Sequence, residues 1–190
     1  MNSESQNPTH IVGVTTRPLD PKCDIRGSFC EIHRDEWGLA PRPVQWSFVI
    51  TNTNALRGFH VHCQRWDYFI VLKGHATLGL KDLRRDQSSF ARATTIDVPS
   101  GTPTVIAVPP GVAHGLYAND NVHFLYGITV AWDGISGDLS CPYDDPELGI
   151  AWPSQNPLVL PHGQDLPDFP TLLRRYEEIA GGRAAAVGLT

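Results

Sequence analysis

The sequence predicts an all-β protein, an antiparallel sandwich or barrel followed by one C-terminal helix. Charged residues make up only 18% of the chain, and 17 Gly and 16 Pro residues supply frequent turns, a balance typical of many short strands. Segments rich in β-branched and aromatic residues follow one another at short spacing, each bounded by Gly, Pro, Asn or Asp. These segments are residues 44–51, 66–72, 75–81, 93–98, 104–108 and 122–132.

The N-terminal part of the chain is less regular. Residues 11–15 suit a short β segment, and residues 24–27 suit a turn centred on Gly27. Further along, the dipeptide Lys73-Gly74 indicates a tight hairpin turn between two of the strands.

The C-terminal part is loop-like before it becomes helical. Residues 133–170 are Pro-rich, and residues 170–180 have the apolar spacing of an amphipathic helix that ends at the Gly pair 181–182. No internal repeat or linker divides the chain. We therefore expect one domain over residues 1–190, with its core at about 44–132 and both flanks packed on it.

Composition also excludes some classes of partner. With 15 Lys and Arg against 20 Asp and Glu, the net charge of −5 gives no general attraction to nucleic acid or to an anionic membrane. The N-terminus lacks the pattern of an export signal, and no apolar stretch approaches the roughly 18 residues of a membrane span. Four cysteines without a C-x-x-C pair are typical of idle thiols in a reducing compartment. We expect a soluble cytoplasmic protein.

Two segments concentrate chemically active side chains. On a strand, His60 and His62 project to the same side, and Asp67 follows five residues later. A Pro-Gly turn at residues 110–111 leads into a strand that carries His114. Together the segments resemble the two signature segments of the cupin superfamily, a double-sheet jelly roll whose metal-binding members use these four residue types as ligands. We expect four of the other histidines to be hydrogen-bonded surface groups, namely His33, His75, His123 and His162.

A narrower resemblance covers roughly residues 10–170. In order and spacing, seven blocks resemble the dTDP-4-dehydrorhamnose 3,5-epimerase family, jelly-roll enzymes that act on nucleotide-linked 4-keto sugars, generally as dimers and without a metal. The blocks are residues 24–31, Gln45, and residues 56–60, 82–84, 110–116, 124–126 and 144–153. The resemblance implies a cupin-type antiparallel jelly roll, a nucleotide-diphosphate sugar as substrate, and a homodimer with no cofactor.

The same resemblance assigns catalytic roles that make chemical sense. A proton next to a ketone is weakly acidic, so its removal requires a positioned base and stabilisation of the enolate. The family's base corresponds to His60, and the tyrosine that reprotonates the opposite face of the sugar corresponds to Tyr126. The aspartate that pairs with the base corresponds to Asp165, with Asp168 as the alternative.

Further residues are implied in substrate binding. Arg57 corresponds to a residue that neutralises the diphosphate, since a guanidinium can hold two oxygens at once. His114 corresponds to a group near the reacting ketone. The family segment that contacts the nucleotide, often across the dimer interface, corresponds to Arg26, Phe29 and Glu31, and a further nucleotide-side contact corresponds to Gln45.

The chain departs from the family pattern near the base. Asp67 stands where the family carries a lysine that stabilises the enolate, and a carboxylate there would repel that charge. Arg65 is a candidate to replace the lysine. His62 stands where the family tends to have Gln, and Trp132 stands where a second tyrosine is expected.

These departures leave three interpretations open. We favour a variant epimerase without a metal, because Tyr126, Arg57 and the Arg26 segment have no role in a pure metal enzyme. The second is a cupin isomerase or oxygenase that holds Zn, Fe, Mn or Ni through His60, His62, Asp67 and His114. The third, suggested by the missing lysine, is a catalytically inactive cupin that binds a sugar nucleotide or an effector.

Overall fold

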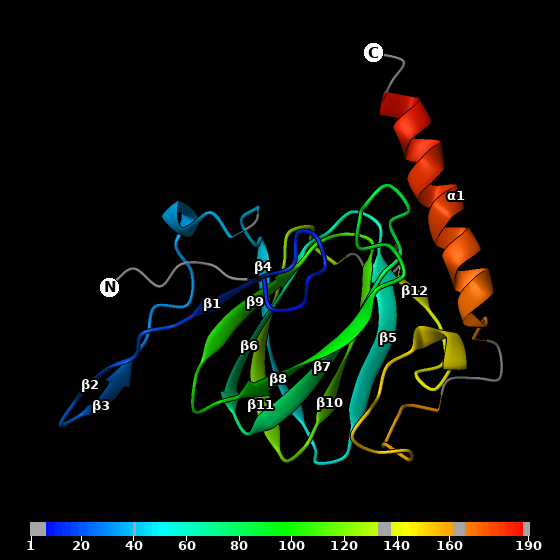
Figure 1. Ribbon diagram of the computed structural model, residues 1–190. Coiled ribbons are helices and arrows are strands. Elements are labelled where there is room, and N and C mark those ends of the chain that lie inside the picture. The colour runs from blue at the N-terminus through cyan, green and yellow to red at the C-terminus, as the bar shows by residue number, and fades with distance from the viewer. Residues whose placement is uncertain (1–6, 40, 133–137, 162–165, 188–190) are drawn as a thin grey trace.

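The computed structural model describes residues 7–39, 41–132, 138–161 and 166–187. Within them, two five-stranded antiparallel sheets face each other (Figure 1). The first sheet has the order β1-β9-β6-β11-β4, with β1 (Thr15–Pro18), β4 (Gln45–Thr51), β6 (Asp67–Lys73), β9 (Thr104–Val108) and β11 (Val122–Ile128). The second has the order β12-β5-β10-β7-β8, with β5 (Leu56–His62), β7 (His75–Asp82), β8 (Ala93–Pro99), β10 (Val112–Ala118) and β12 (Asp138–Ser140). The predicted jelly roll is confirmed.

The main hydrophobic core lies between the sheets. Alternate residues of each strand point inward, as the period of a pleated strand requires. Phe69 and Phe124 enter the core from the first sheet, and Leu78, Leu80 and Leu116 enter it from the second. Removing this apolar surface from water is the main stabilising contribution to the sandwich.

The opposite residues of the same strands build two smaller cores on the outer faces. On the second sheet, Phe59 and Val61 pack with Leu172 of the C-terminal helix α1 (Phe169–Val187) and with the short helix η2 (Pro146–Leu148). On the first sheet, Tyr68 and Ile70 pack against the N-terminal arm, which contains η1 (Asp35–Trp37). Among the described residues, no helix has the length and apolar character that a membrane crossing demands.

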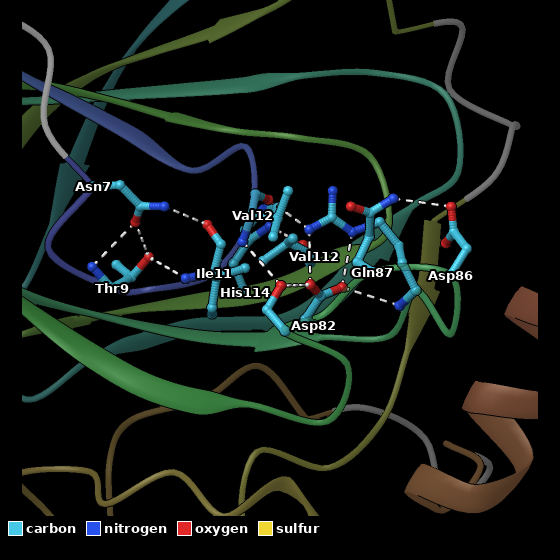
Figure 2. Close-up of polar contacts among 11 residues, drawn as sticks. Asn7, Thr9, Ile11, Val12, Asp82, Asp86, Gln87, Val112 and His114 are labelled. Atoms are coloured by element: carbon cyan, nitrogen blue, oxygen red, sulfur yellow. Dashed lines mark hydrogen bonds and ion pairs between the residues drawn. The ribbon is translucent and has the colours of Figure 1, made fainter.

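A buried polar network ties the N-terminal arm to the second sheet (Figure 2). The carboxylate of Asp82 accepts hydrogen bonds from Arg84 Nε at 2.8 Å and from Ser89 Oγ at 2.6 Å, and Ser89 Oγ in turn accepts one from Val12 N at 2.9 Å. Burial alone would raise the pKa of Asp82, but the hydrogen bonds from Arg84 and Ser89 hold it below its ordinary value. Asp82 is therefore structural, and it lies outside the site described below.

Several local predictions were wrong. The first strand begins at Thr15, because Gly13 adopts a positive φ of 81° in a turn that precedes it. Gly74 does not close a hairpin, since β6 and β7 belong to different sheets and the chain crosses between sheets at this residue. Residues 133–170 contain β12 and η2, which sequence analysis missed.

The C-terminal helix was also predicted too short. It continues past the Gly pair 181–182 to Val187. Glycine weakens a helix by about 1 kcal/mol relative to alanine without forbidding it, so a glycine pair is a weak stop signal.

The chain geometry at Gly58 generates a stability prediction. Gly58 has a φ of 135°, and a Cβ there would lie 2.6 Å from the Cα of Gly115 on the neighbouring strand. Both the strained φ and the backbone clash oppose any side chain. We expect Gly58→Ala to lower the free energy of unfolding by about 2 kcal/mol or more, measured by urea denaturation. Gly101→Ala is the control, because no atom lies within 4 Å of a Cβ built there. Equal free energies of unfolding for the two variants would show that position 58 tolerates a side chain and would contradict this prediction.

Candidate active site

Inward-facing polar side chains from four strands meet between the two sheets. The second sheet contributes His60 and His62 from β5 and His114 from β10, and the first contributes Asp67 from β6 and Tyr126 from β11. His60 and His114 are register partners on adjacent strands. The ring centroid of His60 lies 6.0 Å from that of His62 and 6.0 Å from that of His114. The ring centroids of His62 and His114 lie 5.3 Å apart. The predicted side-by-side placement of His60 and His62 is confirmed.

A cavity of about 350 Å³ opens beside this cluster, a volume within the usual range of small-molecule sites. His60 and Tyr126 line it from opposite sheets, and most of the remaining wall is apolar. The lining residues are Gln45, Ser47, Val49, Leu56, Arg57, Gly58, His60, Arg65, Phe69, His114, Leu116, Phe124, Tyr126, Ile128, Trp132 and Leu160. The cavity therefore offers a few polar groups at fixed points on an apolar surface.

Asp67 is the centre of the polar cluster. Its side chain is 1% exposed, and its Oδ2 lies 3.2 Å from the Nε2 atoms of both His62 and His114. Its Oδ1 accepts a hydrogen bond from the hydroxyl of Tyr126 at 2.8 Å and one from Nε of Arg65 at 3.2 Å. These four side chains are all ionisable or strong hydrogen-bond donors.

Arg65 links the carboxyl to the phenol. Its side chain is only 11% exposed, and Nη2 donates to the hydroxyl of Tyr126 at 3.2 Å and contacts Nε2 of His62 at 3.0 Å. Sequence analysis named this residue only as a substitute for the missing lysine. The structure places the guanidinium on the cavity wall, in contact with Asp67 and Tyr126.

Burial dominates the ionisation of both acidic groups. Desolvation raises the pKa of Asp67, against opposing contributions from His62, Arg65 and the hydrogen bond of Tyr126. Desolvation, followed by the neighbouring Asp67, also raises the pKa of Tyr126 above the ordinary phenol value. Tyr126 therefore keeps its proton at neutral pH and donates it in a hydrogen bond to Oδ1 of Asp67.

Of the two predicted partners of His60, the structure describes Asp168. Asp165 lies outside the described residues. The alternative, Asp168, is exposed, and its Oδ1 accepts a hydrogen bond from Thr171 N at 3.0 Å. It therefore serves as a cap for the first turn of α1.

The predicted binding residues divide into two groups. Arg57, Gln45 and His114 line the cavity, and the guanidinium of Arg57 donates to Thr51 Oγ1 at 2.8 Å. Arg26 and Phe29, in contrast, belong to the hairpin of β2 (Lys22–Asp24) and β3 (Gly27–Phe29), which projects away from the sandwich in Figure 1.

The three residues of the predicted nucleotide segment do not line the cavity of their own chain. Arg26 pairs with Asp24, and Glu31 forms an ion pair with Arg34. Phe29 is 69% exposed.

The metal hypothesis can be compared with this geometry. Donor atoms of His62, Asp67 and His114 lie within 4.8 Å of one another, a grouping that could hold an ion, but His60 is not part of it. Arg65 contributes a fixed positive charge to the same cluster and directs Nη2 at Nε2 of His62. Because a guanidinium can only donate, this contact uses the lone pair that a metal would need. The cluster fits a divalent cation poorly.

Comparisons with known proteins agree with the fold. The family model described as dTDP-4-dehydrorhamnose 3,5-epimerase matches residues 8–169. The spore coat polysaccharide biosynthesis protein SpsL of Bacillus subtilis is 28% identical over 145 residues, 75% of this chain and 96% of that protein. The dTDP-4-dehydrorhamnose 3,5-epimerase of Methanothermobacter thermautotrophicus is 28% identical over 137 residues, 68% of this chain and 74% of that protein.

Solved structures show the same architecture. The epimerase RmlC of Legionella pneumophila, solved with dTDP-4-keto-L-rhamnose, has a TM-score of 0.74 at 25% identity and covers 83% of this chain and 88% of its own. ChmJ, a 3'-monoepimerase from Streptomyces bikiniensis solved with dTDP-quinovose, has a TM-score of 0.79 at 22% identity and covers 90% of each chain.

The cluster around Asp67 generates a prediction about metal content. Because Arg65 already supplies positive charge there, we expect the purified protein to contain far less than one transition-metal ion per chain. Elemental analysis by mass spectrometry checks this, with His62→Ala compared in parallel. Near-stoichiometric metal that disappears in His62→Ala would instead establish the metal site.

Proposed function

This chain belongs to the dTDP-4-dehydrorhamnose 3,5-epimerase family, and we propose that it inverts a carbon next to the ketone of a dTDP-linked 4-keto-6-deoxy sugar by means of His60 and Tyr126. The observation that carries the proposal is that these two residues line one cavity from opposite sheets. Inversion requires a base on one face of the sugar and an acid on the other, which this arrangement supplies.

The proposed reaction has two proton transfers. His60, in its neutral form, takes the proton from the carbon next to the ketone, and the electron pair of that bond forms the enolate. Tyr126 then delivers its phenolic proton to the opposite face of the same carbon. General acid and base groups of this kind each contribute about 10² to 10⁴ in rate.

Arg65 supports the proposal as the source of positive charge. Its guanidinium lines the cavity and donates a hydrogen bond to the oxygen of Tyr126, so it can stabilise both the enolate and the phenolate that remains after proton donation. A planar guanidinium reaching in from the loop thus takes the place of the family lysine. The proposed reaction uses no metal.

The nucleotide diphosphate is proposed to lie toward Arg57 and Gln45. Arg57 lines the cavity but remains exposed, so its charge is available to phosphate oxygens. Gln45 lies on the same wall as Trp132, whose backbone N–H donates to its Oε1 at 3.1 Å. His114 lies on the cavity wall beside His60, where it can approach the ketone.

We also propose that the chain is a homodimer. Strand β4 is an edge strand, and its outward residues Trp46, Phe48 and Ile50 are 37%, 58% and 52% exposed. An apolar row on an unpaired edge favours association. A second copy docked there would also give the projecting hairpin with Arg26 a partner cavity to reach.

The proposed chemistry predicts two different mutant phenotypes in D₂O with a dTDP-linked 4-keto-6-deoxyhexose. We expect wild-type protein to incorporate deuterium at C3 or C5, and His60→Ala to lower the incorporation at least about 100-fold because the base is removed. Tyr126→Phe should lower inversion by a similar factor but retain more of the exchange, since His60 can still remove a proton and return one to the same face. NMR and mass spectrometry measure both quantities.

Matched controls keep this test specific. His75→Ala and Tyr143→Phe make the same chemical changes outside the cavity and should behave as wild type. Binding of dTDP without any exchange by the wild-type protein would overturn the enzymatic proposal in favour of a binding protein.

The dimer proposal is tested separately. Phe48→Asp places a charge in the apolar row, so we expect the mass measured by light scattering to fall from that of a dimer to that of a monomer. Thr95→Asp, on the edge strand β8 of the other sheet, should leave the mass unchanged. A wild-type protein that is already monomeric would rule the proposal out.

A further inference from the structure

The protonation state of Asp67 can be worked out from the donors and acceptors around it. This carboxyl is 1% exposed, and groups from four elements face it: His62 on β5, Arg65 in the loop before β6, His114 on β10 and Tyr126 on β11. Arg65 and the hydroxyl of Tyr126 donate to Oδ1, which leaves Oδ2 to the two imidazoles.

His62 meets this carboxyl as an acceptor. Its Nε2 lies 3.0 Å from Nη2 of Arg65. A guanidinium has hydrogens but no lone pair to offer, so we assign Nε2 of His62 as the acceptor in this contact and place the ring hydrogen on the buried Nδ1. The same Nε2 lies 3.2 Å from Oδ2 of Asp67 and brings no hydrogen to that contact.

His114 leads to the same result from the other side. Its Nδ1 lies 3.1 Å from the carbonyl oxygen of Val112 (Figure 2). A carbonyl only accepts, so this nitrogen carries the ring hydrogen, and a neutral imidazole has no second one. Nε2 of His114 therefore also presents a lone pair to Oδ2, at 3.2 Å.

We propose that Asp67 works as a neutral carboxylic acid whose Oδ2–H is donated to the Nε2 lone pair of His114, and that this frees the phenolic hydrogen of Tyr126 for the cavity. An ionised carboxylate would place lone pairs against lone pairs at Oδ2 and would hold the phenolic hydrogen at Oδ1 in a strong charge-assisted bond. In the neutral acid, Oδ1 is a weaker acceptor, so the hydroxyl can turn toward the substrate while Arg65 still donates to its oxygen. The role of Asp67 is that of a positioning residue, and its catalytic part rests on the proposed function of Tyr126.

The neutral acid also removes a conflict in the sequence. An ionised Asp67 in the place of the family lysine would repel an enolate, whereas an uncharged one leaves the positive charge of Arg65 uncompensated by this carboxyl. Burial favours this state because it raises the pKa of the carboxyl. The neutral form of Asp67 is present at low pH. Proton donation by Tyr126 therefore declines as the pH rises through the raised pKa of Asp67.

Infrared difference spectroscopy tests the protonation state without reference to activity. We expect wild-type protein at neutral pH to show the C=O band of a buried, protonated carboxyl that disappears in Asp67→Asn. Asp97→Asn makes the same change at an exposed carboxyl and should leave the band in place. A spectrum in which Asp67→Asn loses only carboxylate absorption would overturn the proposal.

The pH profile of deuterium incorporation and inversion tests the catalytic consequence. An asparagine reproduces the neutral acid permanently, with an amide N–H toward the imidazoles and an amide oxygen toward Tyr126. We therefore expect the ratio of Asp67→Asn activity to wild-type activity to rise with pH, at least about tenfold across the pH range in which wild-type activity declines. Asp67→Leu, which can neither donate nor accept, should lose activity at every pH.

The outcomes separate the two proposals. A ratio that is constant or falls with pH would contradict the positioning role of the neutral acid. Absence of exchange in the wild-type protein would contradict the proposed epimerase mechanism, while the infrared comparison would still decide the protonation state of Asp67.

Discussion

A carboxyl group buried between two apolar sheets is the constraint on which this site depends. Burying a carboxyl group without hydrogen-bond partners costs several kcal/mol in either protonation state, and Asp67 is almost completely buried. The surrounding sequence meets this cost with two imidazoles, a phenol and a guanidinium, each on a different element. Because these groups share one carboxyl, they hold one another in place beside the cavity.

The geometry of this cluster follows from the alternation of side chains along each strand. On β5 the inward residues are His60 and His62, while Phe59 and Val61 pack beneath α1. On β6, Asp67 and Phe69 both point inward. Tyr68, which lies between them, points outward and packs beneath the N-terminal arm. The same strands therefore stabilise the outer layers and present the reactive groups.

Local pattern was enough to predict how the histidines of the site are placed, while the roles of Tyr126, Arg57 and Gln45 came from the family resemblance. The two-residue spacing of His60 and His62 fixes their common side, and the turn before His114 indicates a second inward strand. The β-branched and aromatic segments likewise predicted most of the sheet strands. What these features share is that they depend on residues close together in the chain.

The errors arose where the answer depends on distant residues. Whether the chain turns or crosses at Gly74 depends on which sheet receives β7, and no local signal carries that information. The contact between Asp67 and Tyr126 joins residues 59 positions apart. Arg26 and Phe29 could be matched to a family segment, but their place on a projecting hairpin depends on the tertiary fold.

Strand β5 has a consequence for how this site can change through evolution. One face of β5 carries the imidazoles and the other carries the residues that pack beneath α1. A single-residue insertion or deletion ahead of Phe59 would exchange the two faces, so that Phe59 would enter the cavity and the imidazoles would lie under α1. Solvent exclusion and reactivity would be lost together. A change that keeps this framework therefore has to replace a side chain without shifting the register of the strand.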